Sequence, residues 1–136
     1  MECGESVLHD AKMMDERVRV WVVDDQVSFR RATAAALAAM DDFVMAGECE
    51  TGESAIELIR DGDAGIVLMD IHMPGMGGIE ATRRIRSAQP DLMVLLMSTY
   101  DVEDLPAAVA DCGAAAYLHK QDLNPDLLTR LSRAAV

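Results

Sequence analysis

The stretch GIVLMDIHMPGMGG, residues 65–78, decides the fold. Its first part is an apolar run, typical of a strand buried on both faces, and this run ends on the acid Asp70. The loop that follows contains Pro74 and Gly75, which favour a turn. A helix is expected over residues 78–87. The stretch therefore predicts one strand, one turn and one helix in succession.

The same unit of strand and helix recurs on both sides of this stretch. The predicted strands cover residues 18–23, 43–49, 65–70, 92–98 and 115–118. The predicted helices cover residues 28–40, 51–61, 78–87, 101–112 and 124 onward. Thr51 and Asn124 favour helix starts, Pro125 suits a first helical turn, and Gly113 supplies a left-handed residue that closes the fourth helix.

Five strands that alternate with five helices require right-handed crossovers and a mostly parallel sheet covered on both faces. We therefore predict a three-layer α/β sandwich, a doubly wound (βα)5 fold of the flavodoxin-like type with strand order 2-1-3-4-5. Residues 1–16 lack periodicity and are expected to be a flexible tail, and residues 17–136 form one domain. The apolar residues expected to face the core from the first two helices are Phe29, Ala36, Leu37, Met40, Ala55, Ile56, Leu58 and Ile59.

Charge and composition exclude several classes of function. The formal net charge of -12 repels phosphate backbones, so we expect no direct contact with nucleic acid. Cys3, Cys49 and Cys112 form no CxxC pair and share no spacing with the three histidines, which argues against a disulfide framework or a zinc site. The apolar runs are too short to span a bilayer and no signal peptide is recognisable, so a cytoplasmic location away from membranes is expected.

Polar residues follow four of the five predicted strands. In a doubly wound sheet, the functional site lies outside the carboxyl ends of the strands, where the strand order reverses. These ends carry Asp24-Asp25, Asp70, Ser98 and Lys120. Residues that are scattered in the sequence are therefore predicted to converge at one edge of the sheet.

These residue types suit phosphoryl transfer to a carboxylate. Three clustered acids repel one another unless a divalent cation lies among them, and oxygen ligands favour Mg²⁺. Asp70 at the strand end is placed to attack a phosphoryl donor and become an acyl phosphate. Lys120 can pair with one phosphoryl oxygen, and Ser98 can donate a hydrogen bond to another. His72 would contribute its backbone carbonyl to the metal, because Mg²⁺ prefers oxygen to a ring nitrogen.

Several motifs together resemble the receiver domains of two-component response regulators, in particular those of LuxR/NarL type. The motifs are VVDD at 22–25, LMDIHMPGM at 68–76, Ser98 before Tyr100, and YLHK at 117–120. The resemblance covers about residues 17–136. It implies that a sensor histidine kinase donates a phosphoryl group to Asp70, and that Mg²⁺ is held by Asp24, Asp25 and Asp70.

The resemblance also implies an output. Ser98 and Tyr117 would report phosphorylation to the face formed by the fourth helix, fifth strand and fifth helix, which then binds a partner or forms a homodimer. Such a chain is not an enzyme beyond its own phosphorylation and dephosphorylation. Two residues depart from the family pattern. Gln121 replaces a common proline after Lys120 and predicts a more mobile lysine loop, and the bulk of Thr99 beside Ser98 predicts slower access of donor or water.

Taken singly, each of these residues is more often unremarkable. Asp24-Asp25 after a strand would usually be a helix cap, Asp70 an ordinary acid at a strand end, and Lys120 a solvated charge. Tyr117 on a buried strand is more often a core aromatic. Only their joint placement favours a phosphorylation site.

Three alternatives stay open at the level of sequence. An aspartyl-nucleophile phosphatase typically carries a second acid two residues after the nucleophile, where this chain has His72. A flavodoxin-like carrier of FMN needs a phosphate loop rich in glycine and hydroxyl groups, which Asp24-Asp25-Gln26 would repel. The third alternative is the regulatory half of a DNA-binding transcription factor, truncated at Val136.

Overall fold

The computed structural model describes residues 17–59, 64–99 and 107–134. The predictions that lie outside these ranges concern the tail, the end of the second helix, the start of the fourth helix and the C-terminus: residues 1–16, Asp61, Gly62, Tyr100, 101–106 and Val136. The domain boundary at residue 17 therefore stays a prediction.

Five parallel strands form a single sheet within the described residues. They are β1 (Val18–Val23), β2 (Phe43–Cys49), β3 (Gly65–Asp70), β4 (Leu92–Ser98) and β5 (Ala116–His119). Their order is β2-β1-β3-β4-β5, with every neighbouring pair parallel. The predicted sheet, including the reversal of order between β1 and β3, is confirmed.

Four α-helices and two short 3-10 helices connect the strands. The α-helices are α2 (Val27–Ala38), α3 (Gly52–Leu58), α4 (Gly77–Ala88) and α5 (Pro125–Ala134). The 3-10 helices are η2 (Ala107–Asp111) and η3 (Lys120–Asp122). Where the sequence predicted a fourth α-helix, the described part is therefore the 3-10 helix η2. Of its residues only Val109 packs against the core, and a helix without an apolar face to bury gains little from tertiary packing.

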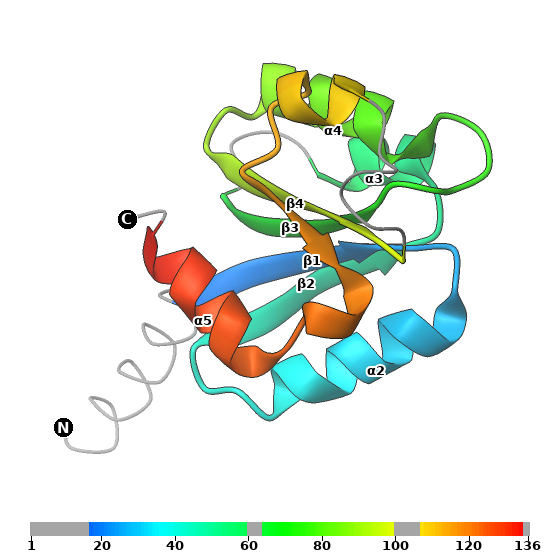
Figure 1. Ribbon diagram of the computed structural model, residues 1–136. Helices are drawn as coiled ribbons and strands as arrows, with labels where there is room; N and C mark the ends of the chain where they lie inside the picture. Colours follow the sequence, from blue (N-terminus) through cyan, green and yellow to red (C-terminus); the bar gives the residue numbers. More distant parts are fainter. Residues whose placement is uncertain (1–16, 60–63, 100–106, 135–136) are drawn as a thin grey trace, which may run out of the picture.

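Helices cover both faces of the sheet, as predicted for a three-layer sandwich (Figure 1). On one face, α3 and α4 pack against an apolar cluster that includes Trp21 and Leu96. On the other, α2 and α5 pack against a cluster that includes Leu68 and Leu95. The three central strands β1, β3 and β4 are buried over most of their length, which is why their sequences are mostly continuous apolar runs rather than alternating ones. No helix in the described ranges has the length and apolar character that crossing a membrane requires.

Three predicted helix boundaries are confirmed by their local chemistry. The hydroxyl of Thr51 accepts a hydrogen bond from the backbone N–H of Ser54 at the start of α3. The side chain of Asn124 accepts one from the N–H of Leu127 at the start of α5. Gly113 has φ +97°, a left-handed conformation that closes the segment after η2.

Two residues predicted to face the core do not. Leu58 is 44% exposed because its side chain lies over Gly47 of the edge strand β2 rather than between α3 and the sheet. Ala36 is also exposed, because α2 turns Thr33 and Leu37 inward at a spacing of four residues. Both errors come from assigning the inward stripe of a helix one position away from its true direction.

Gly78 allows α4 to begin directly against the end of β3. Its backbone N–H donates to the carbonyl of Ile71 at 3.0 Å. A Cβ atom at this position would lie 2.1 Å from the backbone oxygen of Asp70, a distance at which the backbone must move. The close contact between this helix and the strand end therefore requires a residue without a side chain.

We predict that Gly78→Ala destabilises the domain by about 2 kcal/mol or more, because overpacking against backbone atoms cannot be relieved by rotating a side chain. Urea unfolding of both proteins measures the difference.

Gly47→Ala is the matched control, since Gly47 also lacks a left-handed φ and its nearest neighbour is the mobile end of exposed Leu58. It should cost less than about 1 kcal/mol. Equal costs for the two substitutions would contradict this account of Gly78.

Candidate functional site

Chemically active side chains meet at the carboxyl edge of the sheet. Asp24 follows β1, Asp70 ends β3, Ser98 ends β4 and Lys120 follows β5. The register aligns these ends, since Asp70 is level with Met97, the residue before Ser98. Ser98 is in turn level with the residue before Lys120. The structure thus brings together four residues that were predicted to converge.

The acids Asp24, Asp25 and Asp70 form a compact cluster. One carboxylate oxygen from each lies within 4.8 Å of the others. Asp24 has no exposed surface and Asp70 is 4% exposed, whereas Asp25 is open to solvent. Two acids are therefore held below the surface, and the third forms the rim.

Lys120 is the cation closest to this cluster among the ion pairs of the described residues. Its Nζ lies 2.6 Å from Oδ2 of Asp24 and 3.7 Å from Oδ2 of Asp70. Its side chain is only 10% exposed. Nζ also lies 4.7 Å from the centre of the Phe29 ring. The ammonium group is thus shared by two carboxylates and an aromatic face, with its shorter contact to Asp24.

Asp24 is fixed by contacts from three directions. Its Oδ1 accepts a hydrogen bond from the N–H of Gln26 at 2.8 Å, and its own N–H donates to the carbonyl of Cys49 at 3.0 Å. Its carbonyl accepts from Nη1 of Arg30 at 2.6 Å. Nε of the same arginine is paired with Glu48 of β2 at 2.9 Å. Arg30 therefore ties the first turn of α2 to the ends of β1 and β2.

Sequence reasoning missed Arg30 and assigned Phe29 only to the core. Both residues belong to the first turns of α2, the helix that starts just after Asp24-Asp25. Phe29 and Arg30 follow Asp25 by four and five residues. Because one helical turn takes three to four residues, such side chains can lie close to the acids at the helix start. This spacing was the available signal, but it does not tell which side chain turns toward the acids.

The environment of Asp70 disfavours its ionised form. Burial raises the pKa of its carboxyl to about 6, and the neighbouring carboxylate of Asp24 adds to the increase. The ammonium of Lys120 and a long hydrogen bond from the N–H of His72, at 3.4 Å, act in the opposite direction on this pKa. Repulsion between the acids thus exceeds what one lysine offsets.

The cluster fits a hard divalent cation. All three side-chain donors are carboxylate oxygens, the ligand type that Mg²⁺ and Ca²⁺ select. Burial is the main cause of the raised pKa of Asp70, and the carboxylate of Asp24 adds to it; a cation among the acids would offset that repulsion. The three acids can therefore hold a metal ion of this type.

The other predicted residues lie around this edge in different environments. Ser98 is fully buried, and Thr99 beside it is exposed. His72 is exposed, and its backbone N–H faces Asp70. Tyr117 is half-buried and packs against the Trp21 cluster.

The residues after β5 form a defined turn. Lys120 begins the 3-10 helix η3, and the N–H of Gln121 donates to Nδ1 of His119 at 3.2 Å. The side chain of His119 thus caps the short helix that carries the lysine.

The sequence as a whole matches the family model of the response regulator receiver domain over residues 20–132. It is 35% identical over 103 residues to the response regulator GacA of Pseudomonas aeruginosa. The aligned region covers 76% of this chain and 48% of GacA. It is also 35% identical over 107 residues to the transcriptional regulatory protein DegU of Brevibacillus brevis. This aligned region covers 79% of this chain and 45% of DegU. The chain spans about half the length of these curated relatives.

Solved structures support the same relationship. The signal receiver domain of the response regulator NarL from Mycobacterium tuberculosis superposes with a TM-score of 0.75 at 30% identity. The match covers 88% of this chain and 97% of that domain. These comparisons support the sequence-based prediction and favour neither the phosphatase nor the truncated transcription factor.

We predict that Asp70→Asn stabilises the metal-free domain above pH 6 and loses this advantage in acid. The pKa of Asp70 is about 6 in the folded chain and about 4 when unfolded, so the wild type is fully stabilised only below pH 4. That stability is lost as the pH rises from about 4 through 6. At pH 7 the mutant should be more stable by about 2–3 kcal/mol.

Urea unfolding in EDTA at several values between pH 4 and 7 measures this difference. Asp91→Asn is the control, because Asp91 is an exposed acid at the start of β4, at the opposite edge of the sheet. Its effect should not change between pH 5 and 7. An Asp70→Asn effect that is constant with pH would contradict the raised pKa.

Proposed function

Since this chain belongs to the response regulator receiver family of two-component systems, with LuxR/NarL-type receivers among its relatives, we propose that it is switched by phosphorylation of Asp70. One observation carries the proposal: the carboxylate of Asp70 lies beside two further acids and within 3.7 Å of the ammonium of Lys120, at the carboxyl edge of the sheet. This arrangement provides a nucleophile, a metal site and a cation for phosphoryl oxygens in one place.

The proposed reaction transfers a phosphoryl group to a carboxylate oxygen of Asp70. A new bond forms between that oxygen and phosphorus, and the bond from phosphorus to the donor breaks. The bonding electron pair stays on the leaving group. When acetyl phosphate is the donor, the leaving group is acetate. The product is an acyl phosphate, and no proton has to be taken from Asp70 once it is ionised.

Asp24, Asp25 and Asp70, with the backbone carbonyl of His72, are proposed to hold Mg²⁺. When bound, the ion supplies positive charge that offsets the acids and the incoming phosphoryl oxygens. Asp24 and Asp25 would serve only as ligands, because both follow β1, whereas Asp70 ends β3. Arg30 helps to hold Asp24 in place, because its Nη1 donates a hydrogen bond to the carbonyl of Asp24.

Lys120 and Ser98 are proposed to bind the phosphoryl group after transfer. The ammonium of Lys120 already lies 3.7 Å from Asp70, so a small movement would pair it with a phosphoryl oxygen. The hydroxyl of Ser98, one residue beyond the position level with Asp70, would donate to a second oxygen. Thr99, exposed next to Ser98, would narrow the approach of donor and water.

Receiver domains of response regulators interact with sensor kinases. For this chain we propose a histidine kinase as donor, a cytoplasmic location, and an output face around β5 and α5 that includes Tyr117. Phosphorylation would draw Ser98 toward the new group and let the half-buried Tyr117 turn inward, which would favour homodimerisation or binding of a partner. The acidic surface would keep this part of the protein from contacting nucleic acid itself. Its only catalysis would be its own phosphorylation and dephosphorylation.

We predict that acetyl phosphate with Mg²⁺ adds one phosphoryl group to the chain, and that Asp70→Asn abolishes the addition. The reason is that Asp70 ends β3 beside the other acids and lies 3.7 Å from Lys120, whereas Asp24 is already paired with that lysine at 2.6 Å. Intact-mass measurement detects the change.

Asp91→Asn again provides the control and should be phosphorylated like the wild type. Phosphorylation that persists in Asp70→Asn would refute the assignment of the acceptor. Addition of a phosphoryl group in EDTA at the same rate would refute the role of the metal.

Mg²⁺ should also stabilise the folded domain by mass action. At about ten times its dissociation constant it adds about 1.4 kcal/mol, which corresponds to a rise in melting temperature of about 5 °C. Asp25→Asn should lose most of this rise while keeping the fold, because Asp25 is exposed and contributes only its carboxylate. Thermal melts in EDTA and in Mg²⁺ at matched ionic strength test this, and identical melts in both buffers would exclude the proposed metal site.

A further inference from the structure

We propose that Phe29 is a positioning residue for the phosphorylation reaction, in which its ring holds the ammonium of Lys120 while that group exchanges Asp24 for the phosphoryl group on Asp70. This inference rests on the proposed function of Lys120. It assigns to Phe29 a role beyond packing in the core.

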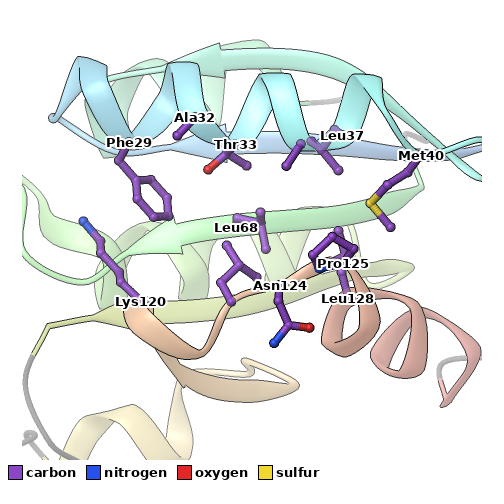
Figure 2. A pocket seen from close by; sticks show the side chains of 12 residues that line it. Phe29, Ala32, Thr33, Leu37, Met40, Leu68, Lys120, Asn124, Pro125 and Leu128 are labelled. Atoms are coloured by element: carbon purple, nitrogen blue, oxygen red, sulfur yellow. The ribbon is translucent and has the colours of Figure 1, made fainter.

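The geometry places the ring directly beside the cation. Phe29 is in the first turn of α2, and its ring centre lies 4.7 Å from Nζ of Lys120. Figure 2 shows the two side chains together at one end of a groove of about 160 Å³ between α2 and the start of α5. Met40 lies at the opposite end of the same groove. Phe29 therefore closes the groove on the side of the acidic cluster.

Lys120 needs such a holder because two carboxylates compete for it. Its contact with Asp24, at 2.6 Å, is shorter than that with Asp70, at 3.7 Å. Asp24 is also a proposed metal ligand, so its negative charge is offset when the metal binds. The ammonium must then move toward Asp70 to meet a phosphoryl oxygen. A lysine has a flexible four-carbon stem, and nothing in that stem directs the movement.

An aromatic face can stay in contact with the ammonium while that group moves, whereas a single hydrogen-bond acceptor cannot. The attraction between a cation and the face of a ring extends over separations up to about 6 Å, so a cation over the face can shift by about an ångström and keep the contact. A hydrogen bond, by contrast, weakens steeply when distance or angle changes. The ring can thus keep its contact with Nζ while one carboxylate is exchanged for another. It also helps to keep Lys120 only 10% exposed, so that the cation is not lost to bulk water.

Packing alone would make a different demand on this position. Phe29 is half-buried and lies against the cluster that includes Leu68, so an aliphatic side chain of similar size would fill the same space. Leucine lacks the negative ring face, whereas tyrosine keeps it. Comparing these two replacements separates the electrostatic role from the structural one.

The experiment measures the rate of phosphorylation by acetyl phosphate at saturating Mg²⁺ for wild type, Phe29→Leu and Phe29→Tyr. The loss of a partly desolvated contact between cation and ring should slow Phe29→Leu by about three- to tenfold. Phe29→Tyr should stay within about twofold of the wild type, which is the rescue that a packing role does not predict. Met40→Leu, at the far end of the groove, serves as control and should leave the rate unchanged.

A double-mutant cycle with Lys120→Met tests whether Phe29 acts through the lysine. The melting temperatures of wild type, both single mutants and the double mutant should show coupling between the two positions. In the Lys120→Met background, Phe29→Leu should cause no further loss of phosphorylation rate. The affinity for Mg²⁺, measured by calorimetry, should change less than twofold in Phe29→Leu, because the ring acts on the site through its contact with Lys120, which is not a proposed metal ligand.

The outcomes distinguish this inference from the proposed function. A wild-type chain that takes no phosphoryl group overturns the proposed function and this inference with it. If the wild type is phosphorylated and Phe29→Leu reacts at the same rate, the positioning role alone is overturned. An equal slowing of Phe29→Leu and Phe29→Tyr overturns it as well, and so does additive behaviour of the two positions in the cycle.

Discussion

The charge balance of the whole site depends on the ion pair between Asp24 and Lys120. A carboxylate without exposed surface is costly to ionise unless a cation lies against it, and the ammonium 2.6 Å away provides that compensation. The pair joins the end of β1 to the end of β5, which lie at separate positions in the strand order. It leaves Asp70, between them on β3, with only the weaker share of the same cation. Burial and the nearby carboxylate of Asp24 raise the pKa of Asp70 by more than this cation lowers it, so an added positive charge would stabilise the ionised site.

Two neighbouring residues of α2 organise this balance from different sides. Arg30 holds the backbone of Asp24 and links it to Glu48, so that the acid is fixed without its side chain being neutralised. Phe29 faces the lysine instead, and the centre of its ring lies 4.7 Å from the ammonium nitrogen. The orientation of one helix thus determines both where the buried acid lies and which partners are open to the cation. A change in the packing of α2 would be transmitted to the site through both residues.

Membership of the receiver family and the electrostatics lead to the same functional conclusion by separate routes. The family assignment rests on similarity along most of the chain. The electrostatic argument rests on three acids, one lysine and their burial, and would hold for an unrelated chain with the same arrangement. Two residues depart from the family pattern. Gln121 is exposed in a short 3-10 helix capped by His119, and Thr99 is exposed beside Ser98.

The sequence by itself determined the order of the strands, the convergence of their acidic ends and the helix boundaries at Thr51, Gly113 and Asn124. The helix boundaries depend on hydrogen bonds within about four residues, and the strand order follows from the alternation of strands and helices, since right-handed crossovers leave few topologies. Only the tertiary structure decided that Lys120 lies closer to Asp24 than to Asp70, that Arg30 and Phe29 join the site, and that Leu58 covers Gly47 instead of the core. Each of these depends on how a helix is rotated against the sheet, and that rotation is fixed by packing between residues far apart in the chain.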